Sequence, residues 1–385
     1  MTTLRSLAQL RASGLVTQER QASLEKVVDR YAVAVPDALT QLIDSSDPHD
    51  PIARQFIPDI AELDHQVSED EDPIGDDAHS PVEGIVHRYP DRVLLKPTQV
   101  CAVYCRFCFR REMVGPGKPN VLSHEAMERA LDYIRTHSEI WEVILTGGDP
   151  LFLSARRLRS IMISLAKIDH VKVVRIHSRV PIAEPERVTR ELVRAMKVST
   201  KAVYVAVHVN HPRELAVDAR AACARIADAG IPLLSQTVLL AGVNDAPEVM
   251  GQLMRTLVEC RIKPYYLHHG DMAKGTSHFR TDLAIGQELM RVLRGRWSGL
   301  CQPTYVLDIP GGHGKSPIGP NYVERVGPNG HAHVVVEDYN GKRHRYLGSV
   351  SDGQHVEKSR RDGKAGKADE HDGDNRVPHE GRVAP

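Results

Sequence analysis

The chain has 385 residues, long enough for one large α/β domain or two smaller ones with a full hydrophobic core. Its 50 basic residues balance its 50 acidic ones, so composition gives no reason to expect a nucleic acid or a membrane surface as a partner. No apolar run reaches the roughly 18–20 residues of a membrane span, and the N-terminus lacks the pattern of a secretory signal. We therefore expect a cytoplasmic protein with no nucleic-acid or membrane partner.

The first expected region, residues 1–85, combines helices with an acidic loop. Apolar residues at helical spacing predict helices up to about residue 60, and Pro36 interrupts the longest of these segments. The stretch 68–81 is rich in Asp, Pro and Gly and predicts a loop. This region is therefore expected to be an N-terminal helical extension.

Strand and helix patterns alternate in the second expected region, residues 86–325. Longer amphipathic segments such as 153–168 and 217–230 separate short β-branched runs. The runs start with Val-Leu-Leu before the first cysteine and continue at 143–150, 172–181, 202–212, 232–240, 264–271 and 304–310. This repeat predicts the α/β class, with a partial (βα)6-type parallel barrel. Polar residues follow the strands, so we expect the site at their carboxyl ends.

Two further regions complete the chain. A hairpin is expected within residues 326–350, with Asn340 and Gly341 at its turn. Residues 351–385 are charged and poor in large apolar side chains, so a disordered tail is expected there.

Three cysteines, Cys101, Cys105 and Cys108, stand in the spacing C-x3-C-x2-C after the first barrel strand. Three thiolates can bind three irons of a cubane cluster and leave the fourth iron open for chemistry, whereas a structural zinc site usually has a fourth ligand. A zinc knuckle and a set of redox thiols are the alternatives. The remaining cysteines stand singly in apolar patterns and are expected to be buried core residues: Cys223, Cys260 and Cys301.

A glycine-rich motif, Asp-Ile-Pro-Gly-Gly-His-Gly-Lys-Ser, spans residues 308–316. It is not a phosphate-binding P-loop, because Ile309 stands where that pattern needs its first glycine. We expect Lys315 to lie on a flexible glycine turn, free to form a Schiff base such as the one that anchors pyridoxal phosphate. A surface lysine on a glycine loop is the alternative.

Several motifs together resemble one family. The segments HRYPDRVLLKPTQVCAVYCRFCFRR, LTGGDPL, GVND, PYYLHHGD, HFRT and DIPGGHGK occur in the order and spacing of lysine 2,3-aminomutases, which belong to the radical S-adenosylmethionine superfamily. The resemblance covers roughly residues 50–325. It implies a [4Fe-4S] cluster, S-adenosylmethionine and pyridoxal phosphate. The implied activity is an isomerase that interconverts L-lysine and β-lysine with a 5′-deoxyadenosyl radical and a pyridoxal phosphate imine.

The resemblance also implies roles for individual residues. Lys315 and Gln236 are the expected catalytic residues, and Arg110, Asp271 and Asp308 are expected to bind the substrate. In that role Arg110 takes the α-carboxylate and the two aspartates take the distal ammonium, because a desolvated cation must be paired. Besides Lys315, the expected cofactor-binding residues are Arg88, Tyr89, Arg92, Gly147, Gly148, Asp149, Ser178 and Arg179.

The chain departs from the family at two places. Phe107 stands where clostridial-type members carry a histidine, and no cysteine cluster for an intersubunit zinc follows Cys301. The alternatives are a relative that makes β-lysine for elongation factor P and a non-enzymatic iron–sulfur electron carrier. Arginine and ornithine also remain open as cationic substrates. The expected partners are L-lysine, a reducing electron donor such as flavodoxin or ferredoxin, and a second copy of the chain in a homo-oligomer.

Overall fold

The computed structural model describes residues 3–114, 121–326 and 333–346. The chain divides into two compact units, Met1–Pro320 and Asn321–Pro385. The predicted disordered tail lies outside the described residues. None of the helices in the described ranges combines the length and the apolar character that a membrane span requires.

The first unit begins with a helical extension, as predicted. Side chains cap three of its helices at their first turns: Ser6, Thr17 and Asp50 each accept a backbone N–H. The preceding helix ends at Arg30, before Pro36 is reached, and Pro36 is the N-cap residue of the next short helix. The elements of the extension are α1 (Leu7–Ala12), α2 (Gln18–Arg30), α3 (Asp37–Thr40), α4 (Pro51–Phe56), η1 (Ile60–Leu63) and η2 (Asp77–His79).

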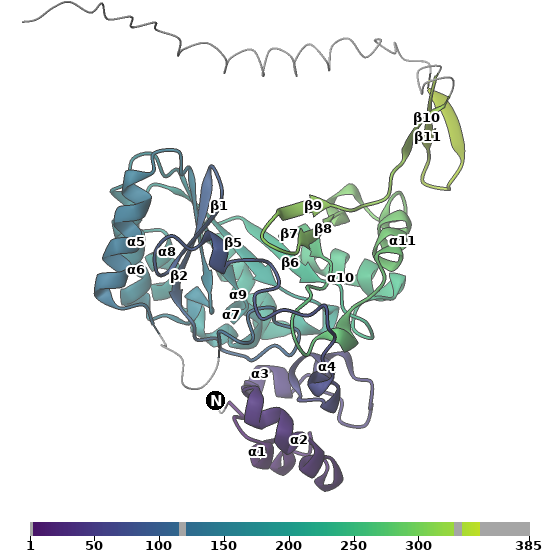
Figure 1. Ribbon diagram of the computed structural model, residues 1–385, viewed down its shortest axis with the longest axis horizontal. Helices are drawn as coiled ribbons and strands as arrows, with labels where there is room; N and C mark the ends of the chain where they lie inside the picture. Colours follow the sequence, from purple (N-terminus) through teal and green to yellow (C-terminus); the bar gives the residue numbers. More distant parts are fainter. Residues whose placement is uncertain (1–2, 115–120, 327–332, 347–385) are drawn as a thin grey trace, which may run out of the picture. The chain divides into compact units, whose positions relative to one another are not determined.

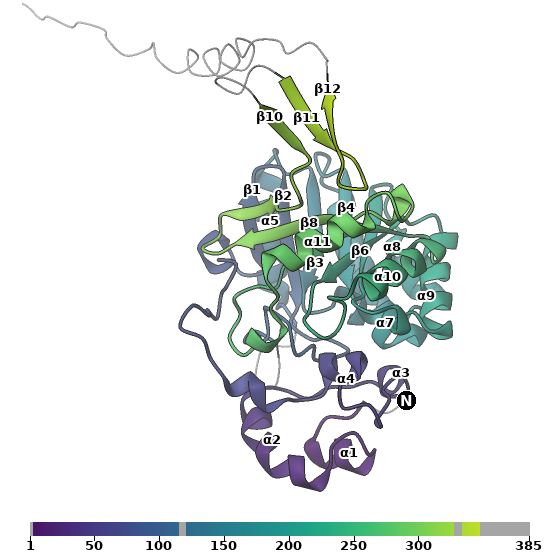
Figure 2. The ribbon, with the colours of Figure 1, turned by 90° about the vertical axis from the view of Figure 1, so that its right-hand side faces the viewer.

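A nine-stranded sheet, curved into a partial barrel, forms the centre of this unit (Figures 1 and 2). Its strands follow one another in chain order; the seven from β2 to β8 are parallel, and β1 and β9 pair antiparallel at the two ends. The strands are β1 (Ile85–Tyr89), β2 (Arg92–Thr98), β3 (Glu142–Gly147), β4 (Val173–Ser178), β5 (Ala202–His208), β6 (Leu233–Val238), β7 (Ile262–His268), β8 (Thr304–Ile309) and β9 (Gly314–Pro317). The predicted α/β partial barrel is thus confirmed.

Helices pack on the outer face of the sheet. They are α5 (His124–Thr136), α6 (Ala155–Ala166), α7 (Val180–Ala183), α8 (Arg190–Met196), α9 (Val217–Asp228), α10 (Pro247–Glu259) and α11 (Leu283–Leu293). Short 3-10 helices join several elements: η3 (Pro150–Phe152), η4 (Pro185–Arg187), η5 (Pro212–Glu214), η6 (Ser277–Phe279) and η7 (Gly299–Cys301).

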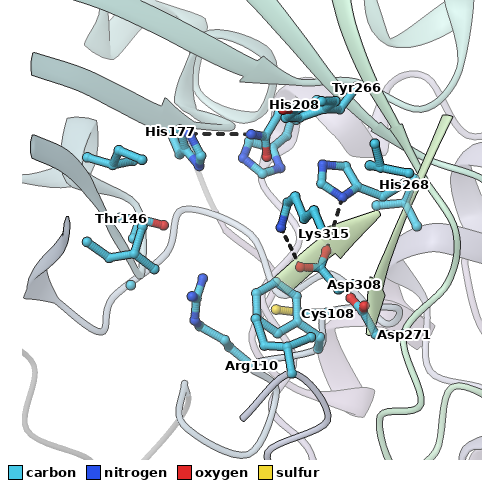
Figure 3. Close-up of a pocket in the computed structure, with 18 of the residues that line it drawn as sticks. Cys108, Arg110, Thr146, His177, His208, Tyr266, His268, Asp271, Asp308 and Lys315 are labelled. Atoms are coloured by element: carbon cyan, nitrogen blue, oxygen red, sulfur yellow. Dashed lines mark hydrogen bonds and ion pairs between the residues drawn. The ribbon is translucent and has the colours of Figure 1, made fainter. Parts of the chain in front are cut away.

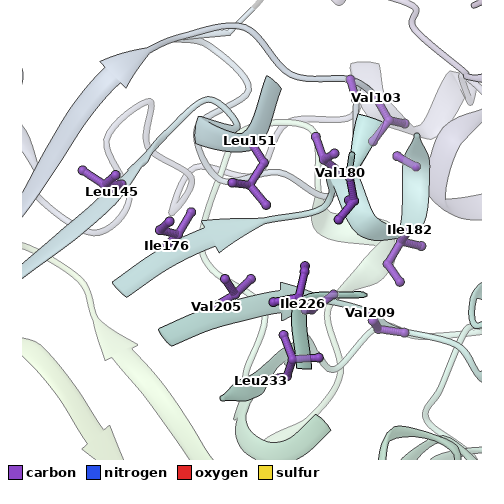
Figure 4. Packing of buried hydrophobic residues seen from close by; sticks show 14 of the residues in the cluster. Val103, Leu145, Leu151, Ile176, Val180, Ile182, Val205, Val209, Ile226 and Leu233 are labelled. Atoms are coloured by element: carbon purple, nitrogen blue, oxygen red, sulfur yellow. The ribbon is translucent and has the colours of Figure 1, made fainter. Parts of the chain in front are cut away.

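The alternation of side chains along each strand separates the core from the barrel interior. On β4, Val174 and Ile176 are fully buried among the core residues, whereas Arg175 and His177 line the interior cavity. Figure 4 shows Ile176 among the branched apolar side chains of this core. The period of two therefore places apolar residues under the helices and polar residues inside the barrel.

The structure corrects the prediction that Lys315 sits on a flexible turn. Gly311 and Gly312 both have a φ of 83°, which lets the chain reverse direction after β8. The returning segment then pairs with β8 as strand β9, in a register that places Asp308 opposite Lys315. The glycine turn thus allows β9 to pair with β8, and this backbone pairing holds Lys315 in position.

The second unit contains a three-stranded antiparallel sheet. Its strands are β10 (Val323–Val326), β11 (His333–Glu337) and β12 (Arg343–Tyr346), and the central strand is β11. The predicted hairpin is confirmed, but β10 was not predicted. Glu337 pairs with Arg343, so Asn340 and Gly341 lie inside a longer loop than a two-residue turn.

Candidate active site

A single large cavity of about 730 Å³ lies inside the barrel. Its lining includes every residue for which the sequence predicted a role: Arg88, Tyr89, Arg92, Cys101, Cys105, Cys108, Arg110, Gly147, Gly148, Asp149, Ser178, Arg179, Gln236, Asp271, Asp308 and Lys315. These residues come from strands and loops distributed between β1 and β9, and the barrel brings them to one space. The volume lies within the range usual for small-molecule sites.

The three motif cysteines lie in the loop that follows β2, at the carboxyl ends of the parallel strands. Burial raises the pKa of the Cys105 thiol to about 12, and the Arg179 guanidinium, 3.7 Å from its sulfur, opposes that shift. No three His, Cys, Asp or Glu side chains in the described ranges are arranged around a single metal ion. A cubane spreads its ligands over separate iron corners, so three thiols without a fourth suit a cluster better than a mononuclear site.

The glycines of the TGGD turn are needed because the backbone approaches the cysteine segment closely. A Cβ on Gly148 would lie 2.5 Å from the Val100 carbonyl oxygen, and Gly147 has a φ of 100°. The Gly148 N–H donates to the Thr98 carbonyl oxygen at 2.7 Å. This turn therefore fixes the chain that leads into the cysteines.

The carboxylate of Asp149 accepts four hydrogen bonds from other residues of the chain. It accepts the backbone N–H groups of Leu151, Arg179 and Val180 and the hydroxyl of Ser178, at distances from 2.6 to 3.0 Å. Four donors occupy all four lone-pair positions of a carboxylate. Asp149 thus joins the ends of β3 and β4, and Ser178 takes part in the same contact.

Arg179 is buried between the cysteine loop and a carboxylate. Its Nη2 donates to Glu214 Oε2 at 2.5 Å and to Gln55 Oε1 at 3.0 Å, while Nη1 faces Cys105. Gln55 belongs to α4, so the N-terminal extension reaches the cluster end of the cavity. A guanidinium in this position suits an anionic iron–sulfur cluster.

Lys315 forms an ion pair in the wall of the cavity. Its Nζ lies 2.5 Å from Asp308 Oδ1, and His268 Nδ1 lies 3.5 Å from the other oxygen of that carboxylate, as Figure 3 shows. Burial works to raise the pKa of Asp308, but the hydrogen bond from His268 and the charge of Lys315 outweigh it and hold that pKa well below its usual range. Asp308 is therefore ionised.

Asp271 lies close enough to this pair to feel the charges of Asp308 and Lys315, and one of its carboxylate oxygens accepts no hydrogen bond. Its Oδ1 is buried and has no hydrogen-bond partner. Burial raises the pKa of Asp271 to about 7, and the negative charge of Asp308 acts in the same direction. A buried carboxylate oxygen without a partner, next to a second carboxylate, suits a cationic group of a ligand.

Arg88 and Arg110 share one carboxylate, that of Asp76. Arg110 donates from Nε and Nη2 to Asp76 Oδ2 at 3.1 and 2.8 Å, and Arg88 Nη2 donates to Oδ1 at 3.1 Å. The Nε of Arg88 is buried without a partner, which leaves a donor for an anion such as a phosphate.

Tyr89 connects these arginines to the lysine strand. Its hydroxyl accepts the Lys315 N–H at 2.7 Å, and the Arg92 guanidinium lies 3.9 Å from its ring centre. The donors, the aromatic ring and the amine of Lys315 thus fit a phosphorylated aromatic aldehyde such as pyridoxal phosphate.

Sequence reasoning missed several residues of the site. Asp76 was assigned only to an acidic loop, and the histidines inside the barrel were not singled out: His177, His208 and His268. Burial lowers the pKa of His208 to about 3 and that of His177 well below its usual value, so both are neutral. Their position on the polar side of alternating strands was the available signal.

The fold and the site together define a radical S-adenosylmethionine enzyme. The model of the Radical SAM superfamily matches residues 95–253, and the model named Lysine-2,3-aminomutase matches residues 290–366. The chain belongs to the lysine 2,3-aminomutase family, whose members are isomerases, and this family implies the [4Fe-4S] cluster, S-adenosylmethionine and pyridoxal phosphate as cofactors.

The relatives agree with this assignment. The L-lysine 2,3-aminomutase of Clostridium subterminale is 42% identical over 326 residues, which cover 85% of this chain and 77% of the relative. That of Escherichia coli is 33% identical over 80% of this chain and 90% of its own length. The glutamate 2,3-aminomutase of Clostridioides difficile is 37% identical over 85% of this chain and 76% of its own length.

Among solved structures, a radical SAM methyltransferase from Sphaerobacter thermophilus matches with a TM-score of 0.43 and 18% identity, over 58% of this chain and 68% of that one. The electron-carrier alternative has no support among these relatives.

Proposed function

We propose that this enzyme interconverts L-lysine and β-lysine by moving the amino group between carbons 2 and 3. The observation that carries the proposal is the pair Asp271 and Asp308 at one end of the cavity, with one carboxylate oxygen buried and unpaired. Because one relative is a glutamate 2,3-aminomutase, family membership alone does not select the amino acid. Two carboxylates favour a substrate whose distal group is a cation.

Arg110 supplies the opposite recognition element. Its Nε–Nη2 edge is occupied by Asp76, which leaves Nη1 for the α-carboxylate of the substrate. A guanidinium held on one edge has a defined direction, so it orients the carboxylate as well as neutralising it. The two ends of an amino acid with a long cationic side chain are thereby matched.

Lys315 is the proposed anchor of pyridoxal phosphate, with Arg88, Tyr89 and Arg92 around its phosphate and ring. When bound, this cofactor supplies a conjugated ring system over which an unpaired electron can spread during the migration. Asp308 pairs with Lys315 in the structure. With pyridoxal phosphate held on Lys315, Asp308 would stand with Asp271 around the substrate ammonium.

The cysteine end of the cavity is proposed to generate the radical. Cys101, Cys105 and Cys108 would hold the cluster, which would supply the electron for the cleavage of S-adenosylmethionine. Gln236 lies within β6 and lines the cavity, and its amide nitrogen lies 3.3 Å from Nε2 of the neutral His177 imidazole. A reducing donor such as flavodoxin or ferredoxin, and the use of the product on elongation factor P, remain predictions.

An anaerobic assay tests the substrate assignment. The reconstituted enzyme is offered L-lysine, L-arginine, L-ornithine and L-glutamate, and amino-group migration is followed by mass spectrometry. L-lysine is expected to be the best substrate, and Asp271→Asn and Asp308→Asn should each lower kcat/KM for lysine at least about a hundredfold, as losing one partner of a buried charge pair does. Reductive cleavage of S-adenosylmethionine without substrate should remain. Lysine turnover that survives in both variants would overturn the assignment.

A further inference from the structure

The cysteine loop carries two arginines that are almost completely buried. Arg106 directly follows Cys105, and Arg111 lies three residues after Cys108; their exposed fractions are 1% and 2%. Both guanidinium groups pair with Glu62 of η1, whose exposed fraction is 0%. Two cations and one anion are therefore buried together beside the cluster ligands, an arrangement that is costly unless every group is paired.

The Glu62 carboxylate uses all its acceptor positions. Its Oε1 accepts the Asp59 N–H at 2.8 Å and Arg106 Nε at 2.9 Å. Its Oε2 accepts the Nη2 groups of both Arg106 and Arg111. The carboxylate thus joins two points of the loop, one on each side of Cys108, and leaves no acceptor for water.

The two arginines continue from Glu62 to backbone carbonyls. Arg106 Nη1 donates to the Ala32 carbonyl oxygen at 2.6 Å. Arg111 Nη1 donates to the carbonyl oxygens of Arg106 at 2.9 Å and Gly275 at 2.8 Å. The bond from Arg111 to the Arg106 carbonyl oxygen closes the loop on itself across Cys108.

The loop backbone is also tied to the N-terminal extension. The Tyr104 N–H donates to the Ala34 carbonyl oxygen, and the Arg106 N–H donates to that of Gln55, each at 2.9 Å. These bonds stand on both sides of Cys105. The residues between the cysteines thus have partners supplied by the protein rather than by a cluster.

We propose that Glu62 is a positioning residue for the iron–sulfur cluster, which makes the N-terminal extension part of the cluster site. Through Arg106 and Arg111 it sets the conformation of the cysteine loop before the cluster is bound. The buried group of three carries one net positive charge, which complements the negative charge of a [4Fe-4S] cluster on three thiolates. The proposal rests on the family cofactor and not on the identity of the substrate.

The test is the rate at which the cluster loses iron. Wild type and Glu62→Gln are reconstituted anaerobically without lysine or pyridoxal phosphate, and a ferrous-iron chelator is then added. Glu62→Gln is expected to release iron about tenfold faster or more, as supporting partners of metal ligands usually show when changed. The electron paramagnetic resonance signal of the reduced cluster should be lower after equal incubation.

Glu69→Gln is the matched control. Glu69 is a buried carboxylate of the same extension and lies 2.6 Å from Arg280, but it makes no bond to residues 104–111. It should release iron at the wild-type rate, even if its melting temperature falls as much as that of Glu62→Gln. Equal release rates in the two variants would overturn the proposal.

A second variant covers the case in which Glu62→Gln does not fold. Arg111→Lys keeps the charge but lacks the planar fork that joins Glu62 and two carbonyls. Fast iron release from folded Arg111→Lys supports the proposal, and release at the wild-type rate contradicts it.

Discussion

At the scale of single residues, Asp271 is a carboxylate of the proposed substrate site whose pKa is shifted. Burial raises the pKa of its carboxyl to about 7. Only the ionised form can pair with an ammonium group, so binding below this pKa must release a proton. The same carboxylate in water would be ionised at all physiological pH values.

A pH dependence of lysine binding follows from this shift. The affinity for L-lysine should fall about tenfold for each pH unit below the pKa of Asp271 and should level off above it. Apparent Kd values measured between about pH 5.5 and pH 8.5 check this expectation. In Asp271→Asn the slope should vanish, and a slope of unchanged size in that variant would assign the titration to another group.

Asp76 is the second residue whose change has a defined outcome. Asp76→Asn leaves Arg88 and Arg110 buried without their shared carboxylate. The free energy of unfolding should fall by about 3 kcal/mol, as it does when a buried pair is broken. The KM for lysine should rise more than kcat falls, because Arg110 loses its orientation. Glu71→Gln, which breaks an exposed pair with Lys274, is the control and should change neither quantity.

At the scale of elements, close backbone contacts position the site. The TGGD turn packs against the segment that enters the cysteine loop, and the hairpin of β8 and β9 packs against the acidic loop. A Cβ on Gly75 would lie 2.5 Å from the backbone nitrogen of Gly312. Such contacts leave no room for a side chain, so the two segments of each pair can meet only through glycine.

Gly148→Ala tests the first of these contacts. The new methyl group would lie 2.5 Å from the Val100 carbonyl oxygen, so the cysteine segment must shift. We expect the protein to lose about 1–3 kcal/mol of stability, the usual cost of overpacking, and to contain less iron after reconstitution. Gly299→Ala is the control, because nothing lies within 4 Å of its added Cβ. Equal iron content in both variants would contradict the role given to the turn.

At the scale of the whole molecule, every residue that lines the cavity belongs to the unit Met1–Pro320. The barrel and its N-terminal extension therefore contain the complete set of proposed cofactor and substrate contacts.

Removal of residues 321–385 is expected to leave the cluster site intact. The shortened protein should take up iron to the level of the full chain and should cleave S-adenosylmethionine in the presence of a strong reductant. Light scattering on both proteins shows whether the second unit contributes to a homo-oligomer. Loss of iron binding from a folded shortened chain, as judged by circular dichroism, would show that the second unit supports the site.

Much of the architecture followed from local patterns. Each parallel strand was predicted because short β-branched runs alternate with amphipathic helical segments, and the cysteine motif was evident because its three cysteines lie within eight positions of one another. The local structure at Lys315 differs from the prediction, because this residue lies on strand β9 and not on a flexible turn. Glycines indicate where a chain can bend, but they do not show that the chain returns to pair with β8.

The sequence by itself predicted the barrel from its periodicity and the cysteine motif from the spacing of near neighbours, and the order of its motifs indicated the family by resemblance. Only the tertiary structure decided which carboxylate meets which arginine. Glu62 meets Arg111 across 49 positions, and Asp76 meets Arg110 across 34. Burying an arginine requires a partner, but the choice of that partner depends on how the extension folds against the cysteine loop, and no local pattern encodes it.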